Sequence, residues 1–164
     1  MGIDLSFLPE SNVASKLLSR LSNERAQRDG IDSGIRQALF FLAVKAVNEM
    51  KQNIKNPPKT GRIYVLSPKL ARLARKKIHQ ASKAGEAPAE MTGKLRRSTK
   101  WRVTGTGEVE FGYGEEYGKF LELGTSKMSM RPNLYPVGHR TARGSNNIFK
   151  REMQLALEAA LTGK

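Results

Sequence analysis

Apolar residues recur at helical spacing through one long segment of the first third of the chain. The pattern predicts a helix that begins at a cap on Asp32 or Ser33 and ends near Ile54. Its apolar stripe consists of Ile35, Leu39, Leu42, Ala46, Met50 and Ile54, and is widened by Phe41, Val44 and Val47. Pro57 and Pro58 should stop the helix, because proline lacks the N–H that a helix needs. A face this wide has to pack against a sheet or another helix, so we expect it to form the main core.

A shorter apolar pattern precedes this helix. Residues 15–28 can form a helix with Leu17, Leu18 and Leu21 on one side, and Asp29-Gly30 should separate it from the helix that follows. We therefore predict an N-terminal arm or peripheral helix over residues 1–30. Residues 31–164 should form a single domain.

Two short alternating runs, separated by a basic segment, follow the long helix. Residues 60–66 predict a turn and a strand, and residues 78–82 predict a short strand that returns. Between them, Ser67-Pro68 predicts the start of a short helix, because serine is a favoured cap and proline is tolerated at the first helical position. Residues 66–77 are therefore expected to be a basic insertion.

The third quarter of the chain combines strand and helix patterns. Residues 95–103 fit either a strand or the tail of a short helix, and a glycine-rich turn leads to a strand over residues 108–114. Residues 115–123 predict a short helix. Gly124 is the expected left-handed stop of that helix, because glycine adopts a positive φ without steric cost.

The last quarter should begin with extended chain. The prolines of residues 131–137 predict an extended segment, residues 138–147 a polar loop and residues 147–161 a final helix. Together these elements predict an α+β fold. In this fold a small, mainly antiparallel sheet packs against the long helix, with a short helix and a C-terminal helix beside it.

Residue composition excludes several kinds of chemistry. The chain has no cysteine, which excludes disulfides, thiolate metal sites and a thiol nucleophile. The two histidines, His79 and His139, are far apart in sequence, and the few aspartates all lie near the N-terminus, so no catalytic or metal-binding cluster is visible. No run approaches the length of a membrane span. We therefore expect no enzyme activity, no cofactor, no membrane partner and synthesis in a cytoplasm-like compartment.

Positive charge is concentrated in one part of the sequence. The formal net charge is +14, and residues 59–102 supply +11 of it, from thirteen Lys/Arg and two acids. Such a sector favours polyanionic partners such as nucleic acid, acidic protein faces or anionic membranes. The candidate contacts in the insertion are Lys69, Arg72, Arg75, Lys76 and Lys77. DNA phosphates, an acidic partner ring and plain solvation remain open for them.

Several short strings occur in a fixed order along the chain. They are Thr60-Gly61-Arg62-Ile63-Tyr64, residues 79–88, Thr92-Gly93-Lys94-Leu95-Arg96-Arg97-Ser98, Leu121-Glu122-Leu123-Gly124-Thr125, and Arg131-Pro132-Asn133-Leu134-Tyr135-Pro136. In this order they resemble the tail-completion (neck) proteins of long-tailed bacteriophages. The resemblance covers about residues 31–161.

The resemblance implies a structural virion protein. Such proteins join as a ring, here expected to hold six copies, at the head-proximal end of the tail. The expected partners are other copies of the chain, the tail tube or its terminator, the head connector, and the genomic DNA that passes through the channel. The alternative that composition supports is a basic nucleic-acid-binding protein that acts through phosphate contacts.

A second group of candidate residues surrounds the predicted helix stop. Glu122 can accept hydrogen bonds from nearby N–H groups or from Arg131, which would fix the course of a loop. The same turn can instead present a contact between subunits. The residues of this candidate clasp or interface are Glu122, Gly124, Thr125, Arg131, Pro132 and Tyr135.

Overall fold

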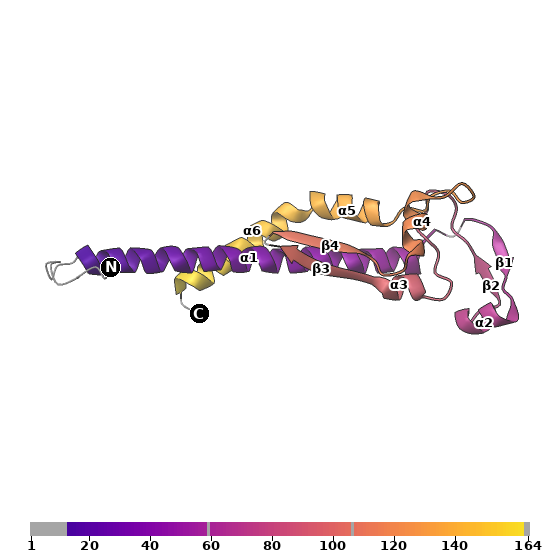
Figure 1. Ribbon diagram of the computed structural model, residues 1–164, viewed down its shortest axis with the longest axis horizontal. Coiled ribbons are helices and arrows are strands. Elements are labelled where there is room, and N and C mark those ends of the chain that lie inside the picture. The colour runs from indigo at the N-terminus through magenta and orange to yellow at the C-terminus, as the bar shows by residue number, and fades with distance from the viewer. Residues whose placement is uncertain (1–12, 59, 106, 163–164) are drawn as a thin grey trace, which may run out of the picture.

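The chain folds into an elongated molecule built along one helix. The computed structural model describes residues 13–58, 60–105 and 107–162. Helix α1 (Val13–Lys55) spans 43 residues and forms the long axis in Figure 1. It ends one residue beyond the predicted position, just before the prolines. The break predicted at Asp29-Gly30 and the cap predicted at Asp32 or Ser33 are wrong, because α1 runs through them without interruption.

Glycines inside α1 serve its packing against the last helix, α6 (Ser145–Thr162). A Cβ atom on Gly30 would lie 3.0 Å from the Cβ of Ala160, and one on Gly34 would lie 3.0 Å from the sulfur of Met153. Glycine weakens a helix by about 1 kcal/mol relative to alanine, and here it also allows two backbones to approach closely. Gly30 is therefore a contact residue, and the division of the chain at residue 30 stays a prediction.

The core lies along one face of α1. Its buried apolar residues, among those described, are Ala38, Leu39, Leu42, Ala43, Ala46, Val47, Met50 and Ile54 of α1, with Leu95 and Val137 from other elements. Most of the predicted stripe is therefore confirmed. Ile35 and Val44 are only half-buried, and Phe41 remains 38% exposed. The face of α1 is buried by α6 and by a hairpin, so both expected kinds of partner are present.

That hairpin consists of β3 (Thr99–Gly105) and β4 (Glu108–Tyr113), which pair antiparallel with Trp101 opposite Phe111. It lies along α1 in Figure 1. Phe111 and Tyr113 pack on the buried cluster of Ala46, Met50 and Val137. The alternating pattern of β4 therefore places its aromatic residues toward the core.

A second, separate hairpin is formed by β1 (Ile63–Val65) and β2 (Ile78–Gln80), with helix α2 (Pro68–Ala74) between the strands. The predicted strands and the basic helix that starts at Pro68 are confirmed. The α+β fold class is confirmed too, with the strands divided between two small antiparallel sheets.

Three further helices complete the fold. Helix α3 (Lys94–Ser98) directly precedes β3, so residues 95–103 contain both of the structures that the pattern allowed. Helix α4 (Tyr117–Leu123) ends at Gly124 as predicted.

The extended segment predicted over residues 131–137 and the loop predicted over residues 138–147 are wrong. Helix α5 (Leu134–Arg143) occupies most of both ranges. Pro136 lies in its first turn, where proline removes no intrahelical hydrogen bond because those N–H groups have no helical partner.

The α1–α6 contact can be tested at Gly34. We expect Gly34→Leu to lower the free energy of unfolding by about 1–3 kcal/mol, because a larger side chain has to push the two helices apart. Chemical denaturation followed by circular dichroism measures this loss. The matched control is Ser33→Leu, on the exposed side of the same turn, which should change stability little. Equal effects from the two substitutions would contradict the close packing.

Candidate interaction site: the basic arm and its root

Residues 60–82, called the arm here, contain β1, α2 and β2 and extend past the C-terminal end of α1 (Figure 1). Of the candidate contacts in the insertion, Lys69, Arg72, Arg75 and Lys77 are exposed. The arm also contains Arg62, which gives it six Lys/Arg and no acidic residue. The structure thus gathers a strong positive charge on a projecting element.

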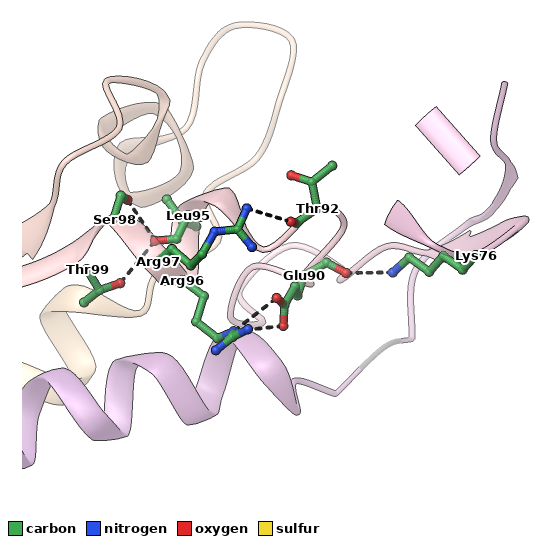
Figure 2. Close-up of polar contacts among 8 residues, drawn as sticks. All are labelled: Lys76, Glu90, Thr92, Leu95, Arg96, Arg97, Ser98 and Thr99. Atoms are coloured by element: carbon green, nitrogen blue, oxygen red, sulfur yellow. Dashed lines mark hydrogen bonds and ion pairs between the residues drawn. The ribbon is translucent and has the colours of Figure 1, made fainter. Parts of the chain in front are cut away.

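Lys76 differs from the other candidate contacts because it is partly buried. Its ammonium group donates a hydrogen bond to the backbone carbonyl of Glu90 at 2.8 Å, as Figure 2 shows. This contact ties the end of α2 to the segment that leads into α3. Lys76 therefore contributes to holding the arm in place.

A polar cleft opens between the arm and α3. Its ionisable lining residues are Lys55, Arg75, Lys76, Glu90 and Arg97. The Glu90 carboxylate accepts from Nε of Arg96 at 3.1 and 3.2 Å, so its charge is already paired (Figure 2). The cleft therefore presents a net positive lining, which suits phosphate or carboxylate groups.

Sequence reasoning missed part of this cleft. The side chain of Arg97 donates to the backbone carbonyl of Thr92 at 3.3 Å, and the α3 helix turns it toward the arm (Figure 2). Lys55 comes from the last turn of α1. Both residues were visible as charges, but their proximity to Arg75 depends on the fold and has no local signal.

Arg75 has an unusual backbone conformation. It caps the C-terminus of α2 with φ 52°, in the left-handed region, where glycine is the ordinary residue. A side chain in this region costs about 1–2 kcal/mol. Arg75 therefore combines a strained backbone with a place in the lining of the basic cleft.

The root of the arm is fixed by close backbone contacts. The amide of Gly61 donates to the carbonyl of Ala81 at 3.0 Å. A Cβ on Gly61 would lie 2.7 Å from that same oxygen, so only glycine fits there. Nearby, the Thr60 hydroxyl and the Lys83 amide donate to the Glu86 carboxylate, and these hydrogen bonds hold the pKa of Glu86 below its ordinary value.

The candidate clasp lies next to this root. Nε of Arg131 donates to the carbonyl of Ser82 at 3.2 Å, and the amide of Arg131 donates to the carbonyl of Leu121 at 2.6 Å. Arg131 therefore links the end of the arm to α4. It is not the partner of Glu122, which was one of the two arrangements expected from sequence.

Glu122 accepts from N–H groups instead, which was the other arrangement. Its carboxylate lies 3.0 Å from the amide of Asn133 and 2.8 Å from the amide of Leu134, and it also accepts from the Tyr113 hydroxyl at 3.1 Å. The two amides belong to the first turn of α5, where they have no helical acceptor. A negative group is further favoured at this end of a helix.

Asn133 extends this network into the core. Its side chain is 1% exposed, donates to the carbonyl of Met50 and to the hydroxyl of Tyr113, both at 3.1 Å, and accepts from Asn53 at 2.8 Å. Burial, and then the charge of Glu122, raise the pKa of Tyr113 well above its ordinary value, so the phenol stays a donor. Sequence reasoning did not assign a role to Asn133.

The remaining candidate residues differ in exposure. Gly124 has φ 75° and ψ −179°, a combination that is essentially restricted to glycine. Thr125 pairs with Met128 in a tight bridge and is exposed. Pro132 is half-buried, and Tyr135 is 75% exposed with its ring stacked on His139. The structure therefore brings Glu122, Arg131 and Pro132 inward and leaves Thr125 and Tyr135 available.

Residues 13–58, 60–105 and 107–162 lack two further kinds of site. No group of three or more His, Asp or Glu side chains there could hold a metal ion. No helix in that part of the chain combines the length and apolar character that crossing a bilayer requires.

A comparison with protein families gives a match over residues 15–124, which span α1 to the end of α4. The matching family is described as "Bacteriophage HK97-gp10, putative tail-component". The chain belongs to this HK97-gp10-like family. Searches of curated proteins and of solved structures gave no match.

Membership confirms the resemblance to phage tail-completion proteins and places the chain in the virion, as a component of the tail. The HK97-gp10-like family is a structural family and not an enzyme family. A component of the tail interacts with other tail or virion proteins. The matched residues include the whole arm and the clasp as far as Gly124.

The clasp can be tested at Glu122. Glu122→Leu should lower the free energy of unfolding by about 2–4 kcal/mol, because the Tyr113 hydroxyl and two amides lose their acceptor in a partly buried place. Glu122→Gln keeps one acceptor oxygen and should lose clearly less. Urea denaturation of the purified variants measures both values. A Leu variant as stable as the parent would show that the network does not hold α4 and α5 together.

Proposed function

We propose that this chain is a tail-completion subunit that forms a ring, of six copies, at the head-proximal end of the tail. The ring joins the tail tube or its terminator to the head connector, around the channel that carries the genome. The proposal rests on the family match and on the order of the strings that resemble neck proteins. The structural observation that carries it is the arm, which projects from the body and is not covered by other described residues.

The arm is built in a way that favours contact with a neighbour. An isolated two-stranded hairpin is marginally stable in water, and β1 and β2 pair only with each other. Val65 of β1 is 84% exposed and Leu73 of α2 is 62% exposed. Apolar side chains gathered on a charged projection mark an interaction surface.

The cleft beside α3 supports a position near the DNA channel. Arg75, Lys76 and Arg97 line it, and the one acid on its wall is paired with Arg96. Contacts of this kind reach phosphates and carry no base sequence information. A ring with these clefts facing its axis would line the channel with positive charge and would bind DNA without sequence specificity.

The position in the particle is tested by removing the gene from the phage that encodes this chain. Electron microscopy should then show filled heads and complete tails that are not joined, and adding the purified chain should restore joined particles. A three-dimensional map of native particles should show the chain as a ring at the neck. Normal joining without the gene, or the chain at the tail tip, would contradict the proposal.

The second candidate function is direct nucleic-acid binding by the free chain, which the charge of the arm and the basic cleft favour. A filter-binding titration with double-stranded DNA at several salt concentrations separates the two. A joining subunit should bind feebly when free. A nucleic-acid-binding protein should bind tightly, and its affinity should fall steeply with salt, with a log–log slope of about −0.9 for each phosphate contact.

Arg75→Gly sharpens this titration, because glycine suits the left-handed backbone at that position and only the charge is lost. Its matched control is Lys150→Gln, an exposed charge on α6. Tight binding that weakens with Arg75→Gly and not with Lys150→Gln would establish the second function. Equal binding by both variants would show that the cleft is not the DNA contact.

A further inference from the structure

The first residues of the chain combine acidic and apolar side chains and contain no cationic one. Residues 1–12 include Asp4 and Glu10, and the first Lys or Arg is Lys16, in a chain that has 29 of them. The large apolar residues of this segment are Met1, Ile3, Leu5, Phe7 and Leu8. The segment precedes α1 and lies outside the described residues. Its composition suits a surface that is both basic and apolar.

The basic cleft between the arm and α3 offers such a surface. Four Lys/Arg side chains line it, and the acid in its described lining, Glu90, is paired with Arg96. Leu73 and Met91 line the same cleft, and Leu73 is 62% exposed. Interfaces with DNA are more polar than interfaces between proteins, and a phosphate backbone would leave Leu73 in water. The mixed lining therefore favours a peptide with acidic and apolar side chains.

The segment cannot reach the cleft of its own chain. Helix α1 runs without interruption for 43 residues, from Val13 to Lys55, so its two ends are about 65 Å apart. Lys55 lines the cleft, which therefore lies at the end of α1 that is far from Val13, as the arm does (Figure 1). Twelve residues span at most about 43 Å even when fully extended. Within an assembly, only the segment of another copy can occupy the cleft.

We propose that residues 1–12 of one copy bind the basic cleft of another copy. Asp4 and Glu10 pair with the cations of the cleft, and the apolar side chains cover Leu73. This rests on the proposed ring function and names its subunit contact. Because the two surfaces differ, the contact is head-to-tail, and such contacts form rings when the rotation between copies closes. Two carboxylates against four cations leave the cleft positive, as a place near the DNA channel requires.

A fluorescent synthetic peptide of residues 1–12 tests the pairing. The acceptor is the full chain with Asp4→Lys and Glu10→Lys, so that its own segment does not compete. Fluorescence anisotropy at low salt should show that the peptide binds. Adding Lys55→Glu and Arg75→Glu to the acceptor should weaken binding by about tenfold or more, because like charges then face each other.

Two controls accompany this titration. Lys150→Glu in the acceptor changes an exposed charge on α6 and should leave binding unchanged. A peptide that itself carries Asp4→Lys and Glu10→Lys should not bind, and this control needs no change in the cleft, so it holds even if a cleft variant misfolds.

Three results of the titration would overturn the proposal. They are a native peptide that does not bind, equal binding of the native and charge-reversed peptides, and equal binding with and without the two cleft substitutions. Duplex DNA should be titrated into the same acceptors. Binding of DNA that depends on Lys55 and Arg75, without binding of the peptide, would show that the cleft holds phosphates instead.

Cysteine cross-linking places the segment in the full chain, which has no cysteine of its own. After mild oxidation of assembled particles, Phe7→Cys with Leu73→Cys should give a ladder of cross-linked species, and so should Leu5→Cys with Leu73→Cys. Phe7→Cys with Leu155→Cys, an exposed position on α6, is the matched control and should give none. An internal cross-link within one chain, dimers from Phe7→Cys alone, or no ladder from either pair would contradict the contact.

The same particles should be imaged, so that the two proposals fail separately. A ring of this chain at the neck without a ladder would leave the proposed function standing and refute the contact. A ladder that stops at the dimer, from two copies that exchange their segments, would keep the contact and refute the ring.

Discussion

The arrangement of α1, α4 and α5 depends on the hydrogen bonds that the carboxylate of Glu122 accepts. It caps α5 through the amides of Asn133 and Leu134, and Asn133 reaches the carbonyl of Met50 inside the core. Three elements that are distant in sequence are thereby held in one place. A buried polar network of this kind is favourable only when every member has its partner, so it specifies one geometry and tolerates few others. Arg131, between α4 and α5, connects this network to the arm, because its side chain donates a hydrogen bond to the carbonyl of Ser82.

The molecule consists of a well-packed body and a solvent-exposed arm. Packing along α1 and the clasp hold the body, whereas the arm keeps cations and apolar side chains in solvent. Charge of one sign on the arm favours solubility, and the arm's apolar residues stay exposed in the single chain. This division suits a component that has to stay separate until it meets the growing tail.

Sequence reasoning succeeded where structure is decided locally. The proline stop of α1, the Ser67-Pro68 start of α2 and the positive φ of Gly124 follow from backbone sterics at those residues. It failed where distant contacts decide. Gly30 lies inside a helix at the point where α6 packs closely against it, and the first turn of α5 is capped by the distant Glu122. Within the candidate site, the exposed cations were predicted, but the convergence of Lys55, Arg75 and Arg97 was not.

The strings that carry the family resemblance have a common physical role. Gly61 allows the close approach at the root of the arm, Gly124 adopts a backbone only glycine favours, and Arg131 holds the carbonyl of Ser82. These residues set where the arm leaves the body and in which direction it points. The tip of the arm, from Lys69 to Lys77, lies outside the strings. A root of fixed geometry with a tip of different sequence would let one scaffold present different contact surfaces. The arm, and not the core, therefore decides what this tail component binds.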